Sequence, residues 1–248
     1  MKKIIAMLLA LVMILSFAAC AGQSADPTEP ATEPATDPVT DPVVESGIMT
    51  YEEYLAAELD AEVVIETYVQ ATQSWWDNKI TVYCQDEVGA YFLYELACSE
   101  EDAAKLVAGT KIRVTGYKGE WAGEVEIMDG TFDFVEGADN LYVGAEDYTE
   151  LLGTDELITK QNMLGAFFGL TVENIAYKND EPGDDIYLTL GYNGASYDFC
   201  VERYLTDPDS EVYTIVGTLN VGDVVNVEGF VYWYEGPNPH ITSIYLAE

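Results

Sequence analysis

The sequence predicts an all-β protein with short helices, built from two tandem copies of one five-stranded unit. The repeat is clearest in segments 106–116, LVAGTKIRVTG, and 219–229, LNVGDVVNVEG, which share the form L-x-x-G-x-x-[IV]-x-V-x-G. In both segments a turn glycine precedes alternating apolar residues, a pattern typical of a half-buried strand. The same order of predicted elements surrounds the two segments, so we expect each copy to form its own small β-barrel.

Each copy is predicted to begin with a short helix and a long strand. Thr50 and Glu53 have the spacing of a capping box, and Thr154 opens the corresponding segment of the second copy. Alternating apolar residues follow each helix, as in a strand with one buried face. The predicted helices are 50–59 and 154–162, and the predicted first strands are 63–71 and 167–174.

A β-hairpin follows a polar loop in both copies. In the second copy the hairpin strands are joined through Asn193-Gly194, a dipeptide that favours the tight turn of a hairpin. In the first copy the turn is expected at 86–89. The predicted hairpin strands are 80–85 and 90–97 in the first copy, and 186–191 and 195–202 in the second.

A second helix and two more strands complete each copy. Ser99 is a preferred N-cap residue, and Asp207-Pro208 places a proline at the first position of the other helix. The fourth strands lie in the repeated segments. The predicted helices are 99–106 and 207–216, and the predicted fifth strands are 124–128, with an extension toward 135, and 241–246.

The order β-β-β-α-β-β, with a helix between strands three and four, resembles the OB-fold, a five-stranded Greek-key barrel. The resemblance covers residues 50–136 and 154–248, although five such strands can also form a small sandwich. We therefore expect two tandem five-stranded OB-fold-like barrels, each preceded by a short helix. The expected domains are a signal peptide at 1–20, a disordered linker at 21–47, and barrels at 48–148 and 149–248.

The N-terminus has the features of an export signal with a lipid anchor. Lys2 and Lys3 precede an apolar run that ends at Phe17, and small residues then lead to Cys20. This pattern resembles the signal of bacterial lipoproteins, which implies a lipidated Cys20 and an extracytoplasmic, membrane-anchored location in the bacterial cell envelope. The alternative is an ordinary signal peptide cleaved near Ala19. Prolines that each follow an acidic residue then predict an extended spacer.

The chain is strongly acidic, with 10 Lys and Arg against 45 Asp and Glu and a formal net charge of −35. A field of this sign repels phosphate polymers, so we expect no nucleic-acid partner. Cationic ligands, metal ions and neutral sugars stay open, as does a purely solubilising role for the acids. The whole chain resembles uncharacterised bacterial surface lipoproteins with tandem OB-fold-like domains, and this resemblance implies no known activity.

Catalytic candidates are scarce, and we expect a protein that is not an enzyme. His240 is the only histidine, and the chain has neither a G-x-S-x-G motif nor a glycine-rich phosphate loop. A hydrolase is the third function considered, with no nucleophile and base that can be named. Cys84, Cys98 and Cys200 are expected to be free thiols, part-buried in strands.

Aromatic residues gather in the loops through which small barrels of this kind bind ligands, namely those between strands one and two and between strands four and five. Flat aromatic faces beside acids and amides suit sugar rings, so we expect a non-enzymatic cell-surface module that binds a glycan or a peptide. The alternative is a structural or assembly lipoprotein without a small ligand, in which these residues join the copies or contact a protein partner. The candidate ligand-binding residues are Trp75, Trp76, Tyr117, Trp121, Tyr232, Trp233 and Tyr234.

One acidic loop suggests a metal ion. Asp180, Asp184 and Asp185 surround a glycine turn between the first two strands of the second copy, and calcium prefers such oxygen ligands. The spacing differs from that of the EF-hand loop, and a solvated turn is the alternative. Apart from this candidate calcium site we expect no cofactor.

Overall fold

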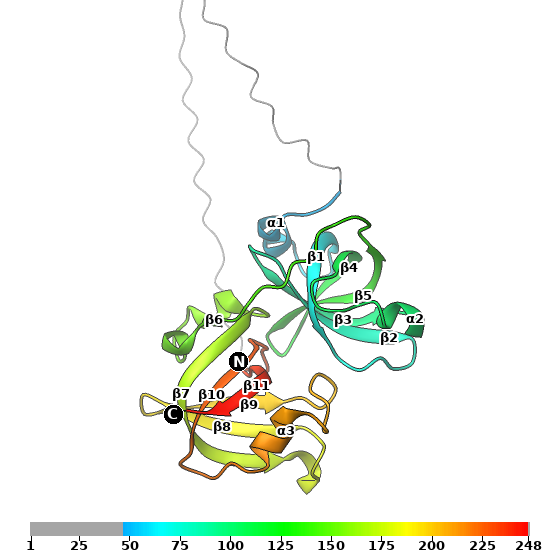
Figure 1. The fold of residues 1–248 in the computed structure, drawn as a ribbon. Coiled ribbons are helices and arrows are strands. Elements are labelled where there is room, and N and C mark those ends of the chain that lie inside the picture. The colour runs from blue at the N-terminus through cyan, green and yellow to red at the C-terminus, as the bar shows by residue number, and fades with distance from the viewer. Residues whose placement is uncertain (1–46, 248) are drawn as a thin grey trace, which may run out of the picture. The chain divides into compact units, whose positions relative to one another are not determined.

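The computed structural model describes residues 47–247, which belong to one compact unit of strands with a few short helices (Figure 1). The predicted signal peptide, its lipidation at Cys20 and the linker up to residue 46 lie outside the described residues. Within 47–247, no helix is long and apolar enough to span a membrane. The all-β class with short helices is confirmed.

The strands of the first copy close into a five-stranded barrel, as predicted. Their pairing order is β1-β2-β3-β5-β4, and β1 also pairs with β4. Side chains alternate along β1, so that Val63 and Ile65 point into the barrel and are fully buried. The strands are β1 (Glu62–Thr72), β2 (Lys79–Gln85), β3 (Ala90–Ala97), β4 (Lys111–Trp121) and β5 (Glu124–Phe134).

Two short helices belong to this barrel. Helix α1 (Tyr51–Ala56) has the predicted capping box, in which the Glu53 backbone N–H donates to the Thr50 hydroxyl and the Thr50 N–H donates to the Glu53 carboxylate. Tyr54 from α1 is buried in the barrel core. Helix α2 (Glu100–Ala103) follows the predicted N-cap Ser99. Both helices are shorter than predicted, because the chain leaves the helical conformation soon after the first turn.

The second copy forms a six-stranded sheet instead of the predicted five-stranded barrel. The strand order is β10-β11-β9-β8-β7-β6, and β10 also pairs with β7. The added strand β6 (Glu146–Asp147) lies within the range predicted for the first domain, but it pairs in parallel with β7. Two residues are too few for a periodic sequence signal. The other strands are β7 (Leu164–Tyr177), β8 (Ile186–Tyr192), β9 (Ala195–Val201), β10 (Val224–Phe230) and β11 (His240–Leu246).

The helices of the second copy also differ from the prediction. Segment 154–162 forms no α-helix and contains only the 3-10 turn η2 (Leu157–Lys160), which follows the 3-10 turn η1 (Thr149–Leu151). Helix α3 (Glu211–Val216) begins after Ser210, whose hydroxyl accepts a hydrogen bond from the backbone of Tyr213. Asp207 instead accepts from the backbone of Asp209 and so closes a turn before the helix. A third 3-10 turn is η3 (Lys178–Asp180).

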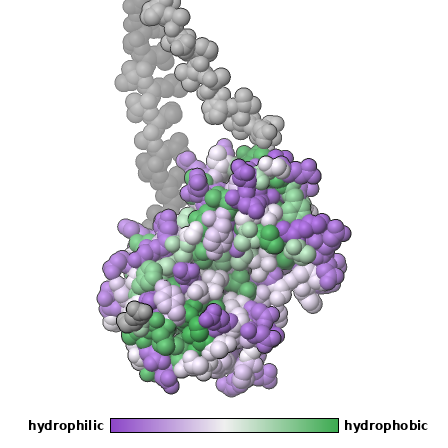
Figure 2. All heavy atoms as spheres, viewed as in Figure 1, coloured by the Kyte–Doolittle hydropathy of each residue, from purple (hydrophilic) through white to green (hydrophobic). Residues whose placement is uncertain are grey.

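A small apolar cluster joins the two copies within the compact unit. Tyr83 from β2 and Phe92 from β3 pack against Leu164 from β7 and Phe230 from β10, and all four side chains are buried. The rings of Tyr83 and Phe230 stack with centroids 4.4 Å apart. The cluster therefore covers part of the outer face of β2 and β3. Elsewhere, hydrophilic residues cover much of the face shown in Figure 2.

Candidate ligand-binding pocket

The loop between β1 and β2 ends in a tight turn that displays Trp76. Asp77 and Asn78 both have positive φ, 49° and 60°, as the central residues of a type I′ turn do. Trp76 and Lys79 exchange backbone hydrogen bonds of 3.0 and 2.9 Å across this turn. The Trp76 side chain is 72% exposed, so its indole face is open to solvent.

Trp75 is held in a different way from its neighbour. Its indole packs against the barrel core, and its Nε1 donates a hydrogen bond of 2.8 Å to the carbonyl of Cys98. Adjacent residues in an extended segment point to opposite sides, which explains why one tryptophan is anchored and the other is displayed.

The outer face of β2 and β3 is divided by the contact with the second copy. Alternation along the strands places Thr81 and Tyr83 of β2, and Phe92 and Tyr94 of β3, on this face. Tyr83 and Phe92 are buried in the cluster that joins the copies. Tyr94 lies beyond that cluster and is 42% exposed. The second copy therefore covers one part of the face and leaves the other part open.

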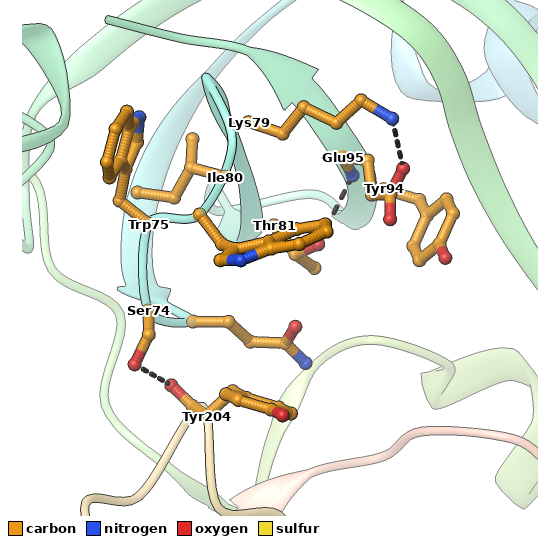
Figure 3. A pocket seen from close by; sticks show the side chains of 10 residues that line it. Ser74, Trp75, Lys79, Ile80, Thr81, Tyr94, Glu95 and Tyr204 are labelled. Carbon is orange, nitrogen blue, oxygen red and sulfur yellow. Dashed lines mark hydrogen bonds and ion pairs between the residues drawn. The ribbon is translucent and has the colours of Figure 1, made fainter. Parts of the chain in front are cut away.

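A pocket of about 440 Å³ lies on the open part of this face (Figure 3). Its aromatic residues come from three separate elements: the β1–β2 loop supplies Trp75 and Trp76, β3 supplies Tyr94, and the segment after β9 supplies Tyr204. Tyr204 is 54% exposed. The other lining residues are Gln73, Ser74, Lys79, Ile80, Thr81 and Glu95.

An ion pair stands at the edge of the pocket. Lys79 Nζ lies 2.6 Å from Glu95 Oε2, and both side chains are part-exposed. The hydrogen bond to Glu95 raises the pKa of Lys79. The Glu95 backbone N–H also donates to the Thr81 hydroxyl at 3.2 Å, and its φ of 49° marks an irregular point in β3. These contacts fix a donor and an acceptor beside the aromatic rings.

Tyr204 is positioned by contacts within its own segment and with the first copy. The Ser74 backbone N–H donates to the Tyr204 carbonyl at 2.7 Å, which ties the second copy to the loop that carries the tryptophans. The Glu202 carboxylate accepts from the backbone N–H groups of Tyr204 and Leu205, at 3.1 and 2.7 Å. The guanidinium of Arg203 lies over the Tyr204 ring, 5.3 Å from its centroid.

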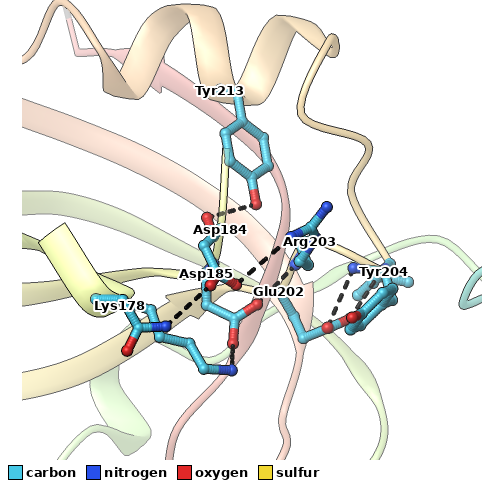
Figure 4. A network of polar contacts seen from close by, with 9 residues as sticks. Lys178, Asp184, Asp185, Glu202, Arg203, Tyr204 and Tyr213 are labelled. Atoms are coloured by element: carbon cyan, nitrogen blue, oxygen red, sulfur yellow. Dashed lines mark hydrogen bonds and ion pairs between the residues drawn. The ribbon is translucent and has the colours of Figure 1, made fainter. Parts of the chain in front are cut away.

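The acidic loop after β7 supports this same segment (Figure 4). Asp185 is buried, and its Oδ1 accepts from the backbone N–H of Arg203 at 3.0 Å. Its Oδ2 lies 2.8 Å from Lys178 Nζ. The hydroxyl of Tyr213 in α3 donates to the carbonyl of Asp184 at 3.0 Å. The loop thus connects β7, the Tyr204 segment and α3.

Two of the three predicted calcium ligands have other partners in the structure. Both carboxylate oxygens of Asp185 are occupied by the contacts just described. Asp184 accepts from Asn179 Nδ2 at 3.3 Å and lies 3.9 Å from Arg203, while Asp180 is exposed on η3. Throughout the described part of the chain, no group of three His, Cys, Asp or Glu side chains could hold a metal ion.

The remaining predicted aromatic residues lie outside the pocket. Trp233 is part-buried, and its indole lies so close to Gly123 that a side chain there would collide with it. Tyr232 is part-buried and stacks on the His240 ring at 4.1 Å. Tyr117 and Trp121 lie on β4 instead of in a loop, because β4 continues to the turn at 122–123.

Trp121 forms an exposed pair with Tyr234 across the two copies. Their ring centroids are 5.2 Å apart, and both side chains are exposed. The structure thus brings the candidate residues together in two places, at the pocket and at this pair. The pocket also includes Tyr94 and Tyr204, which are not among the ligand-binding residues predicted from the sequence. Alternation along β3 could have found Tyr94, whereas Tyr204 is brought to the pocket only by tertiary contacts.

His240 is placed in the interior and not in a catalytic arrangement. It is the first residue of β11, it is buried, and its Nδ1 lies 2.6 Å from the Tyr83 hydroxyl of the first copy. Burial lowers the pKa of His240 to about 3, so the ring is neutral at physiological pH. The three cysteines of the described region are free and are buried rather than part-buried; Cys84 lies on β2 and Cys200 on β9, whereas Cys98 follows the end of β3.

No known protein family matches this chain, and no curated protein matches it either. Solved structures resemble it in part. A murine DNA-binding protein bound to double-stranded DNA has a TM-score of 0.37 at 10% identity, over 75% of this chain and 95% of that one. The Ifi202 HINa domain in complex with 20-bp double-stranded DNA has a TM-score of 0.34 at 12% identity, over 75% and 98% of the two chains.

A shorter resemblance involves asparaginyl-tRNA synthetase from Pyrococcus horikoshii. The TM-score is 0.29 at 17% identity, and the match covers 34% of this chain and 19% of the synthetase. This chain therefore matches about a fifth of the synthetase.

These comparisons correct the expectation that nucleic acid is excluded as a partner. The murine protein and the Ifi202 domain are both described as bound to double-stranded DNA. The exclusion relied on a net charge summed over the whole chain. That sum describes the long-range field, whereas recognition depends on how individual side chains are arranged at a surface. Net charge therefore does not exclude nucleic acid as a partner of this chain.

Proposed function

We propose that this protein is a non-enzymatic cell-surface module that binds a glycan in the Trp76 pocket. The observation that carries the proposal is the convergence of three exposed rings, from Trp76, Tyr94 and Tyr204, on one pocket of about 440 Å³. Such a volume falls in the range of small-molecule sites. The rings come from both copies, so the pocket depends on the contact between them.

The chemistry of the lining suits a sugar. Aromatic faces pack against the C–H face of a sugar ring, and the polar groups at the edge can bond to its hydroxyls. The Lys79–Glu95 pair supplies a donor and an acceptor, and Gln73 and Ser74 add further polar groups. A peptide is the other ligand that such a surface suits, and it is an outcome of the test below.

Glycan-array screening followed by affinity electrophoresis tests the proposal. We expect Trp76→Ala to abolish the retardation that the wild-type protein shows on the gel containing its glycan. Trp121→Ala is the matched control, because Trp121 is also an exposed tryptophan but lies outside the pocket. Loss of binding in Trp121→Ala together with full binding in Trp76→Ala would place the site elsewhere. Binding of peptides alone would replace the glycan with a peptide.

We further propose that Cys20 carries a lipid that anchors the protein in the bacterial cell envelope. The support is the N-terminal pattern of a basic start, an apolar run and small residues before Cys20, followed by the proline-rich segment. Cys20→Ser is expected to move the protein from the membrane fraction to the soluble fraction of cells. A variant that stays with the membranes would contradict the anchor.

The second copy is proposed to be an OB-fold-like unit as well. The support is the pairing of β7 with β8, β8 with β9, β9 with β11, β11 with β10 and β10 with β7, which follows the order found in the first copy. In this view β6 is an addition at the edge of the unit.

A structural or assembly role is the second candidate function. It is favoured by the exposed pair of Trp121 and Tyr234, because exposed aromatic residues are enriched in protein interfaces. Sedimentation velocity tests it: self-association that Trp121→Ala removes would support assembly through this pair. A monomer at all concentrations would leave self-assembly unsupported.

A further inference from the structure

The Trp76 pocket does not end at Tyr94 but adjoins a second pocket of about 480 Å³. The two pockets share Lys79, Tyr94 and Glu95. The ion pair and the Tyr94 ring therefore stand between them as a common wall. The other residues of the second pocket are Asp77, Asn78, Ala97, Met128, Asp129, Gly130 and Thr131.

The groove formed by the two pockets is bounded on one side by the contact with the second copy. On that side, Tyr83 and Phe92 of the β2–β3 face are covered where they meet Phe230. At the β4–β5 turn, Trp233 lies against Gly123. The open direction runs from Tyr204, past Trp76 and the ion pair, to the middle of β5. The position of the second copy thus decides which way a bound chain can continue.

The lining of the second pocket indicates an uncharged ligand rich in hydroxyl groups. Lys79 is the only Lys or Arg that lines either pocket, and its ammonium group is paired with Glu95. Asp77 and Asp129 are exposed carboxylates that accept hydrogen bonds and repel anions. Thr131 and Asn78 can both donate and accept. This set suits sugar hydroxyls better than the carboxylates of uronic acids.

From these observations we infer that the ligand is a neutral oligosaccharide of two or more rings. One ring stacks in the Trp76 pocket, and the chain crosses the Lys79–Glu95 pair so that a further ring lies in the pocket beside β5. The inference rests on the proposed function and adds the length and charge class of the ligand. A second contacted ring adds hydrogen bonds and buried area, so affinity should rise about tenfold or more from one ring to three.

A length series measured by isothermal titration calorimetry tests this inference. The probes are ladders of one to six rings of β-1,4-linked glucose, β-1,4-linked N-acetylglucosamine and α-1,4-linked glucose. For the ladder that binds, the wild-type affinity should rise with length and then reach a plateau. A ladder of the same lengths whose rings carry carboxylates, as uronic acids do, should bind at least tenfold more weakly.

Ala97→Phe is designed to fill the second pocket alone. Ala97 lies at the exposed end of β3, where an aromatic side chain is compatible with a strand. This variant should bind a single ring like the wild type but lose the gain with length. Ala195→Phe, at the exposed start of β9, is the matched control and should keep the full gain. Thermal melting of both variants checks that they are folded.

The outcomes separate the two proposals. One outcome is that Trp76→Ala abolishes sugar binding but the wild-type protein binds one ring and six rings with equal affinity. That outcome overturns this inference and leaves the proposed function standing. An unchanged length gain in Ala97→Phe does the same. If no ladder binds to the wild-type protein, this inference fails; if no glycan binds on the array either, the proposed function fails with it.

Discussion

The backbone N–H of Trp233 in the second copy donates a hydrogen bond of 2.8 Å to Glu124 Oε2 in the first copy. Glu124 is fully buried. Burial raises the pKa of Glu124 to about 8, and burial also raises the pKa of Glu126 to about 7. At neutral pH the contact between the copies therefore contains a carboxyl group, that of Glu124, that holds a proton.

Stability is expected to fall as the pH rises from about 5 to 9. Both carboxyl groups keep their protons in the folded state to a higher pH than in the unfolded state, where a glutamate has its ordinary pKa of 4.5. The folded state thus binds more protons than the unfolded state in this window. The stabilisation from the two protonated carboxyl groups is fully present below a pH of about 4.5 and is lost as the pH rises past 7 and 8. Each group contributes at most about 1.4 kcal/mol per pH unit. Urea denaturation at several pH values measures this slope.

Glu124→Gln is the matched variant for this pH dependence. The amide keeps an acceptor for the Trp233 N–H but cannot ionise. We expect a shallower fall of stability with pH, with the remaining slope due to Glu126. An equally steep fall in Glu124→Gln would show that Glu124 does not carry the proton assigned to it.

Tyr83→Phe is expected to destabilise the protein by about 1–3 kcal/mol. The change removes the hydroxyl that bonds to His240 Nδ1 and leaves a buried polar atom without this partner. The measurement is the free energy of unfolding in urea. Tyr187→Phe, on the exposed side of β8, is the control and should change stability by less than about 0.5 kcal/mol.

The His240 imidazole should show no titration between pH 5 and 8 in NMR spectra. Its pKa is lowered to about 3 by burial, and it is the only histidine, so its signals are easily assigned. A midpoint near 6.5 would mean that the ring is open to water and that the buried contact with Tyr83 does not persist in solution.

Trp75 and Trp76 should respond to alanine substitution in opposite ways. Trp75→Ala removes core packing and the hydrogen bond to the Cys98 carbonyl, so a loss of about 1–3 kcal/mol in stability is expected. Trp76→Ala removes an exposed side chain and should change stability by less than about 0.5 kcal/mol. Thermal and urea unfolding of both variants provide the measurement. Equal losses would contradict the separation of roles.

Asp185→Asn should weaken sugar binding through the position of Tyr204. The substitution removes the charge that holds Lys178 and weakens the acceptor for the Arg203 N–H, so the Tyr204 segment is less restrained. We expect a several-fold loss of affinity for the shortest sugar that binds. Asp180→Asn, in the same loop but exposed, is the control and should bind like the wild type.

Local sequence signals predicted much of the fold. The capping box at Thr50 formed as expected, and the first hairpin has Cys84 paired with Tyr91 about the predicted turn. These features depend on residues a few positions apart, which the sequence displays directly. The predicted start of α3 was wrong because two suitable N-cap residues lie close together. Asp207 and Ser210 are both good helix caps, and α3 begins after Ser210 because Asp207 closes a turn.

The sequence by itself determined the duplicated order of strands and the hairpins, since alternation and turn residues act locally. Only the tertiary structure decided that the second sheet gains β6, that Tyr204 joins the pocket and that Glu124 lies beneath Trp233. Those contacts join residues more than 15 positions apart in the chain. Their geometry is set by how the two copies pack, and no local pattern encodes that packing.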